Sequence, residues 1–206
     1  MKDTCTIHKR SGDGGFSLLE LIIVIAVILI LAAMTVPKIM TEVDVVRVRY
    51  SATDLSGVLQ RARMEAVRKN AVYSVQYTAG PPAIESIVDR NLAAPVPAIP
   101  PAVLGSNVTS VYGAGSGAPG EAAFVASLNF TSLAAAATGL PSFNARGLPC
   151  VRTSPTVCTQ TLGQGFAFFL SGASAAGANV TWSAVVVTPS GRCETWAYNG
   201  TNWNQQ

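Results

Sequence analysis

The chain has 206 residues, of which 49% are hydrophobic and only 12% are charged, and its formal net charge is +3 at pH 7. A charge this small does not by itself indicate a nucleic-acid partner. The only histidine is His8, near the N-terminus, so the remainder has none for a catalytic triad or a histidine-ligated metal site. With abundant Gly, Ala, Ser and Pro, the composition favours one exported, β-rich domain with long loops over a cytosolic enzyme.

A polar segment, residues 1–15, opens the chain and contains Lys2, Lys9 and Arg10. Basic residues before an apolar segment predict that this end faces the cytoplasm and that the rest is exported. Removing residues 1–15 takes away three basic and two acidic residues, which leaves 11 basic and 9 acidic residues and a net charge of +2.

The small residues that could admit a peptidase lie before the apolar segment. A secretory signal would carry its cleavage site after the apolar run, where Ala33-Met34-Thr35 is a poor match. Gly14 and Gly15 instead precede the run directly. Cleavage after Gly15 would make Phe16 the new N-terminus of an intact apolar segment.

Residues 16–36 are almost wholly apolar, and as a helix these 21 residues would span roughly 31 Å, about one hydrocarbon core. We therefore expect a transmembrane helix. Glu20 lies inside it, and a carboxylate there costs about 2.5–3.5 kcal/mol on insertion scales, so it requires a partner. Cleavage after Gly15 would create one, the α-amino group of Phe16 on the same chain or on a neighbour.

The segment Gly15-Phe16-Ser17-Leu18-Leu19-Glu20 resembles the class III leader of type IV pilins and type II secretion pseudopilins. The resemblance implies that a prepilin peptidase cuts between Gly15 and Phe16 and N-methylates Phe16. It also implies that Glu20 pairs with the N-terminus of a subunit during assembly. Pro37 lies where many of these chains carry a helix-weakening proline. The alternative is an ordinary signal anchor with a chance glutamate.

The helical pattern continues beyond Pro37, with apolar residues at helical spacing. They form a first stripe and then a shifted one: Ile39, Val43, Val46 and Tyr50, followed by Leu55, Val58, Leu59, Ala62 and Ala66. Residues 16 to about 69 are therefore predicted to form one helix of roughly 80 Å, whose amphipathic half, residues 37–70, covers a sheet. We expect a bend or local melting at Pro37 and a stop at Asn70.

Three further segments resemble H-type pseudopilins and the related T-type minor pilins. They are Ala62-Arg63-Met64-Glu65-Ala66 with Lys69-Asn70, the turn Phe143-x-x-Arg146-Gly147, and Gly191-Arg192 before the last long strand. The resemblance implies a pilin-like α+β fold, in which the long N-terminal helix packs on a mainly antiparallel β-sheet in the exported domain, residues 71–206.

The remaining pattern predicts strands separated by breakers. Alternating or apolar runs predict strands at 71–77, 84–89, 166–170, 180–188 and 193–198, with turns at 142–149 and 189–192. Residues 79 to about 120 are rich in Pro and Gly, so we expect exposed loops that add nothing to a packed core. The aromatic residues of the late strands are expected to pack in the sheet core and at its edges: Phe166, Phe168, Phe169, Trp182 and Trp196.

Three cysteines, Cys150, Cys158 and Cys193, would remain after cleavage, in a compartment that oxidises thiols. Cys150 and Cys158 bracket a short loop that closes at low entropic cost, whereas Cys193 opens a strand. We expect a Cys150–Cys158 disulfide and a buried, free Cys193. The alternatives are three reduced thiols or a pair that includes Cys193. Three cysteines without histidine would leave a tetrahedral metal site unfilled.

The sequence thus favours an H-type pseudopilin of the type II secretion system, with no catalytic residues and no cofactor. Its expected partners are other pseudopilins, the prepilin peptidase and methyltransferase, and inner-membrane lipid. The exported domain would be periplasmic. The alternative is a T-type minor pilin of a type IV pilus that binds DNA through Arg192 and Arg146, with Arg152 as an unproven companion. Glu194 argues against it, because a carboxylate repels phosphate. A membrane-anchored hydrolase has only scattered Ser and Asp in its favour.

Overall fold

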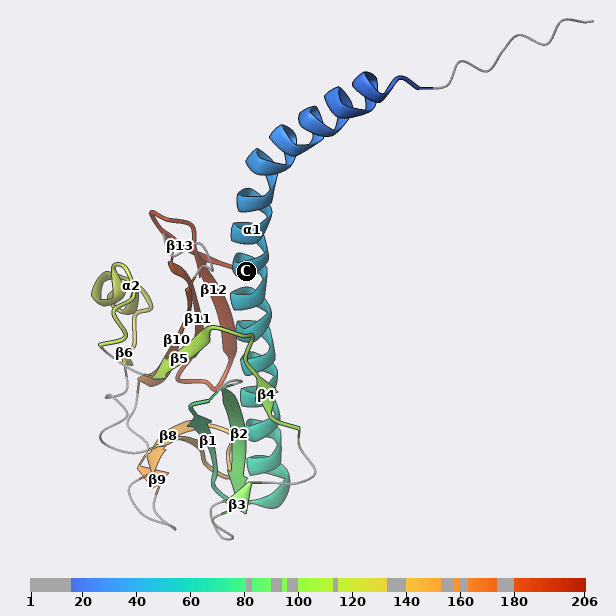
Figure 1. Ribbon diagram of the computed structural model, residues 1–206. Coiled ribbons are helices and arrows are strands. Elements are labelled where there is room, and N and C mark those ends of the chain that lie inside the picture. Colours follow the sequence, from blue (N-terminus) through green and yellow to red (C-terminus); the bar gives the residue numbers. More distant parts are fainter. Residues whose placement is uncertain are drawn as a thin grey trace, which may run out of the picture. The chain divides into compact units, whose positions relative to one another are not determined.

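The computed structural model describes residues 16–80, 83–89, 94–95, 100–112, 115–132, 140–152, 158–159, 163–173 and 180–206 (Figure 1). Residues 1–15, including the cleavage residue Gly15, lie outside the described residues. The chain divides into two compact units, residues 1–39 and 40–206. The helix α1 (Leu18–Lys69) runs through the boundary between them.

In the first unit, the large apolar side chains of α1 have no protein cover. They are exposed from Leu18, at 75%, to Met34, at 68%, and Phe16 just before the helix is 79% exposed. By length and composition, α1 could cross a membrane. The helix continues without a break through Pro37, so local melting is not seen there, and a bend at Pro37 stays a prediction.

In the second unit, α1 buries a stripe of mostly small and medium side chains. Its members are Val48, Ala52, Leu55, Val58, Leu59, Ala62 and Ala66. The expected first stripe is wrong as a packing face, since Val43 and Val46 are 41% and 48% exposed and Tyr50 is 69% exposed. Position 50 is two residues from Ala52, which at 3.6 residues per turn places the two side chains on nearly opposite faces. The helical spacing of apolar residues predicted both stripes, but it does not show which of them the sheets cover.

The predicted stop of α1 at Asn70 is confirmed. Asn70 has a φ of 50°, its N–H donates to the carbonyl of Val67 at 3.3 Å, and the N–H of Ala71 donates to the carbonyl of Ala66 at 3.1 Å. These two bonds form a Schellman motif, in which asparagine is the usual substitute for glycine at the left-handed position.

Two sheets follow α1. The first, sheet A, has the order β3-β2-β1-β7-β8-β9, with β4 paired to β2. The second, sheet B, has the order β13-β12-β11-β10-β5, with β6 paired to β10. All strand pairs of the described residues are antiparallel except β6 with β10. The fold is therefore the expected α+β, pilin-like arrangement of a long helix followed by antiparallel sheets.

The strands of sheet A are β1 (Tyr73–Thr78), β2 (Ile84–Asp89), β3 (Ala94–Pro95), β4 (Ala102–Val103), β7 (Leu140–Phe143), β8 (Pro149–Arg152) and β9 (Cys158–Thr159). Those of sheet B are β5 (Val108–Tyr112), β6 (Thr131–Ser132), β10 (Gln164–Ala173), β11 (Val180–Val187), β12 (Cys193–Tyr198) and β13 (Trp203–Gln205). A second helix, α2 (Glu121–Ser127), precedes β6.

The side chains of successive residues in a strand point to opposite faces of the sheet. The two faces of sheet B therefore contribute to two separate hydrophobic cores. One face packs under α1 through Phe166, Phe168 and Leu170, together with residues of sheet A. The other face carries Phe169, which packs with α2 and the last strands. In Figure 1, α1 and α2 accordingly lie on opposite sides of sheet B. The expected core and edge role of the aromatic residues is confirmed.

The expectation of a loop-rich, coreless segment between 79 and 120 is partly wrong. It contains β5, whose Val108 is buried under α1, and Ala102 and Leu104 are buried as well. Ala118 comes from one of the Gly-rich blocks and joins the core on the far face of sheet B. Short strands between Gly- and Pro-rich segments form because their side chains pack in the folded protein. The local composition alone does not predict them.

Candidate functional site

The described residues begin at Phe16, within the segment that is predicted to be processed. Phe16 and Ser17 precede α1, and the N–H of Leu21 donates to the carbonyl of Ser17 at 3.1 Å. Glu20 lies in the first turn of α1, where the partial positive charge of a helix N-terminus favours a carboxylate. In lipid this exposed carboxylate would still need a cationic partner.

A second site lies in the other unit, and we call it the Arg63 cluster: Arg63, Gly147, Ser190 and Gly191. The Nε of Arg63 donates to the carbonyl of Gly147 at 3.0 Å, and its Nη2 donates to the carbonyl of Ser190 at 3.2 Å. Gly147 lies in the β7–β8 turn of sheet A, and Ser190 lies in the β11–β12 turn of sheet B. One side chain of α1 therefore joins the helix to both sheets.

The β7–β8 turn is built around Asn144. The N–H of Gly147 donates to its carbonyl at 2.8 Å, and its Oδ1 accepts from the N–H groups of Arg146 and Leu148 at 2.9 and 3.1 Å. Such an asparagine-centred turn is what the local sequence predicted. It presents the carbonyl of Gly147 to α1.

The β11–β12 turn closes through Thr188. Its carbonyl accepts from the N–H of Gly191, and its N–H donates to the carbonyl of Arg192, both at 2.8 Å. Gly191 has a φ of 80°, and a Cβ there would lie 2.5 Å from the carbonyl oxygen of Gly147 and 2.9 Å from the Nε of Arg63. Only glycine fits this position, because both the backbone conformation and the close approach exclude a side chain.

The Arg63 cluster brings together the three short segments that the sequence marked by resemblance. Arg63 is separated from Gly147 by 84 residues and from Ser190 by 127. The hydrogen bonds of the cluster fix the position of α1 on the sheets. Sequence reasoning missed the role of Arg63, although its occurrence with two glycine-containing turns was the available signal.

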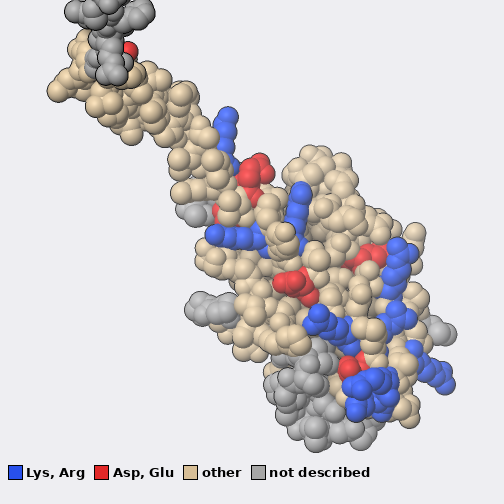
Figure 2. All heavy atoms as spheres, turned by 90° about the vertical axis from the view of Figure 1, so that its right-hand side faces the viewer, with Lys and Arg blue, Asp and Glu red and all other residues tan. Residues whose placement is uncertain are grey.

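The three arginines that would bind DNA in the alternative function differ in their surroundings. Arg146 is exposed, and Arg192 is exposed but lies 3.4 Å from the carboxylate of Glu194. Arg152 is half-buried, and its Nε is buried without a hydrogen-bond partner. Figure 2 shows basic side chains interspersed with acidic ones on the face it presents. That face does not carry a continuous field of one sign, which is what strong phosphate binding uses.

Two of the three cysteines are paired as expected, whereas Cys193 is half-buried and not buried as predicted. A disulfide joins Cys150 of β8 to Cys158 of β9, with their Cα atoms 5.5 Å apart. Cys193 is free and half-buried against the core under α1. Burial raises the pKa of its thiol to about 11, while the charge of Arg63 opposes the shift. Among the described residues, no group of three or more His, Cys, Asp or Glu could hold a metal ion.

We expect non-reducing peptide mapping to recover Cys150 and Cys158 in one linked peptide. Their sequence separation is 8, and closing so short a loop stabilises the folded state by about 2.5 kcal/mol in the chain-entropy model. Replacing both residues with serine should lower the free energy of unfolding by about that amount. A linked peptide that contained Cys193 would contradict the pairing.

Cys193 should resist alkylation in the folded protein. Only the thiolate reacts, and the raised pKa keeps the thiol protonated up to about pH 11. We expect iodoacetamide at pH 8 to label Cys193 far more slowly in the native protein than in urea. Because an unfolded thiol titrates at lower pH, this group stabilises the fold below pH 9 and loses that contribution as the pH rises towards 11. Equal labelling rates in both states would show that the thiol is not protected.

Residues 10–36 match the family model described as the prokaryotic N-terminal methylation motif. No curated protein and no solved structure matches the chain. The matched residues include the predicted cleavage position, Glu20 and the apolar first half of α1, which is consistent with membrane anchoring. The methylation motif, together with the long helix and the antiparallel sheets, supports a type IV pilin-like protein.

Proposed function

We propose that the chain is an H-type minor pseudopilin, a subunit of the pseudopilus that drives protein export in the type II secretion system. The observation that carries the proposal is the methylation motif on an exposed apolar helix. The Arg63 cluster joins the three segments that resemble H-type pseudopilins and T-type minor pilins alike. Support for the H-type comes from Glu194, whose carboxylate lies 3.4 Å from Arg192 and would repel phosphate.

In this proposal the work of the chain is assembly, not catalysis. The prepilin peptidase cuts before Phe16 and methylates it, and the chain rests in the inner membrane with its second unit in the periplasm. On assembly, Glu20 of one subunit pairs with the N-terminus of a neighbour, and the apolar helix exchanges lipid for other helices. The exposed apolar side chains from Phe16 to Met34 are the surface that must be covered.

Cleavage between Gly15 and Phe16 is the first test. Co-expression with a prepilin peptidase should shorten the chain by its first 15 residues and add one methyl group, which intact mass and N-terminal sequencing both report. Gly15→Val should abolish the cut, because a peptidase that requires a small residue excludes a β-branched one. A Gly14→Val variant is the matched control and should still be cut. An intact Met1, or a cut after the apolar run, would overturn the proposal.

A T-type minor pilin that binds DNA is the second candidate. The observation in its favour is that Arg146 and Arg192 lie in the two turns that the Arg63 cluster holds together. If the chain has this function, the purified protein should lower the electrophoretic mobility of a DNA duplex at low salt. The double variant Arg146→Ala, Arg192→Ala should bind the duplex more weakly and with a smaller salt dependence. A protein that leaves DNA mobility unchanged would favour the secretion system, as would neighbouring genes for a secretin and a secretion ATPase.

A further inference from the structure

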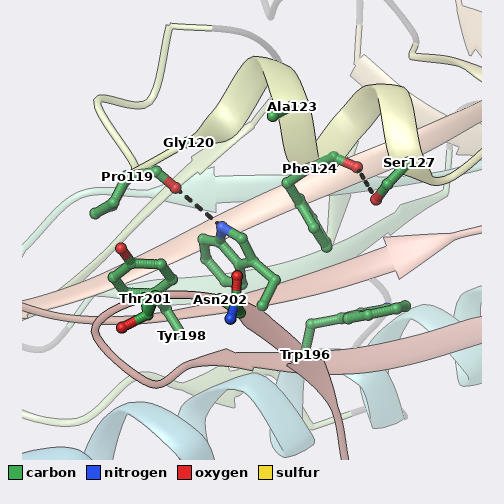
Figure 3. Close-up of a pocket in the computed structure, with 10 residues that line it drawn as sticks. Pro119, Gly120, Ala123, Phe124, Ser127, Trp196, Tyr198, Thr201 and Asn202 are labelled. Carbon is green, nitrogen blue, oxygen red and sulfur yellow. Dashed lines mark hydrogen bonds between the residues drawn. The ribbon is translucent and has the colours of Figure 1, made fainter.

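An aromatic recess lies on the face of sheet B that is turned away from α1. It has a volume of about 280 Å³ and is lined by α2 and by the hairpin of β12 and β13. Phe124, Trp196, Tyr198 and Trp203 contribute rings to its walls, and Asn202 contributes an exposed amide (Figure 3). Its position on the far core of sheet B leaves it outside both sites described above.

The rings of the recess are held in place before any ligand arrives. Trp203 stacks on Phe124 with ring centroids 4.7 Å apart and an interplanar angle of 28°, and its Nε1 donates to the carbonyl of Pro119 at 3.0 Å. The hydroxyl of Tyr198 donates to the carbonyl of Gly200 at 3.0 Å. A rigid site loses little conformational entropy on binding.

The chemistry of the recess indicates a neutral ligand. None of its lining residues is charged, and Trp196, Tyr198 and Trp203 are all partly exposed. Grooves lined by aromatic rings are the usual receptors for proline-rich segments, which present flat apolar rings and free carbonyl groups. The side chain of Asn202 can donate to such carbonyls.

The chain itself carries a segment of this kind, Ala94-Pro95-Val96-Pro97-Ala98-Ile99-Pro100-Pro101, with four prolines and no charge. Ala94 and Pro95 form the edge strand β3 of sheet A, residues 96–99 lie outside the described residues, and Pro100 and Pro101 are exposed at the surface. These two prolines border a hollow that Asp54 and Arg61 of α1 also line. The two prolines therefore lie beside α1, whereas the recess lies on the face of sheet B that is turned away from α1.

We propose that the aromatic recess binds residues 94–101 of a second copy of this chain. The two surfaces differ, so the contact is head-to-tail, and repeated contacts of this type give a closed ring or an open row of subunits. Eight residues form a small interface and therefore a weak contact, which suits an assembly that other surfaces also hold. The biological setting rests on the proposed filament function, although the binding itself can be measured without it.

The test uses the full chain in detergent micelles and a synthetic peptide with the sequence of residues 94–101. The indole N–H signals of Trp182, Trp196 and Trp203 are followed by NMR as the peptide is added. We expect saturable shifts for Trp196 and Trp203, which line the recess, and none for Trp182, which does not. A peptide with alanine in place of all four prolines should bind at least about tenfold more weakly.

A matched pair of variants on α2 links the shifts to the recess. Ala123 is exposed and lines the recess, whereas Ala126 is exposed on the same helix and does not line it. Ala123→Arg should weaken peptide binding about tenfold or more, and Ala126→Arg should leave it unchanged. The proposal is overturned if the peptide causes no shift or if both variants weaken binding equally. None of these outcomes affects cleavage after Gly15, so they remain distinct from a failure of the proposed function.

Discussion

Replacing Arg63 with alanine should lower the free energy of unfolding by about 3 kcal/mol, because two carbonyls lose a charged donor and each such bond is worth about 1.5–3 kcal/mol. The bond to Gly147 is partly buried, whereas the bond to Ser190 is exposed and counts for less. Urea unfolding of the full chain in micelles, followed by tryptophan fluorescence, measures the change.

Arg61→Ala is the matched control, since Arg61 lies on the same helix and is exposed. Surface substitutions of this kind usually change the free energy of unfolding by less than about 0.5 kcal/mol. Gly191→Ala tests the same cluster from the opposite side, because its Cβ would meet the carbonyl oxygen of Gly147 and the Nε of Arg63. The two changes share partners, so their effects should not add. Equal stability of the Arg63→Ala and Arg61→Ala variants would show that the cluster does not hold the unit together.

Much of the fold could be predicted because its signals are local. The long apolar and amphipathic run gave α1, and Asn70 ends it by adopting the left-handed conformation that its residue type tolerates. The turns at Asn144 and Gly191 follow from residues whose side chains or free φ angles make those turns. β2 has the predicted bounds, Ile84–Asp89.

The parts that the sequence did not reveal depend on contacts between distant residues. Val43 and Tyr50 follow helical periodicity as well as Leu55 does, yet only Leu55 is buried, because the sheets dock on one face of the helix alone. β5 lies between breakers and gains its place by pairing with β10. α2 is only seven residues long and is anchored by the single buried side chain of Phe124.

The candidate sites also differ in whether they are formed by neighbouring or by distant residues of the sequence. The cleavage position, Phe16 and Glu20 lie within six residues of one another, so a local motif was enough to propose them. Arg63 has its partners 84 and 127 residues away, and no local pattern gives such a distance. The aromatic recess likewise combines Phe124 of α2 with Trp196 and Trp203 of the last strands, which only the folded chain brings together.

Replacing Glu20 with alanine should reduce incorporation into filaments at least about tenfold while leaving membrane insertion intact. Removal of the carboxylate eliminates an insertion cost of about 2.5–3.5 kcal/mol, so the variant should enter the membrane at least as well as the natural chain. In the assembled state, however, the cationic N-terminus of a neighbour would be left without its partner in an apolar surrounding, and a buried charge without a partner is strongly unfavourable.

The measurement compares the amount of the Glu20→Ala chain in the membrane fraction with the amount in filaments sheared from cells that express the other subunits. Glu42→Ala is the matched control, because Glu42 is an exposed acid of α1 beyond the apolar run, and it should assemble normally. Equal recovery of the Glu20→Ala and Glu42→Ala chains in sheared filaments would show that the carboxylate plays no part in assembly.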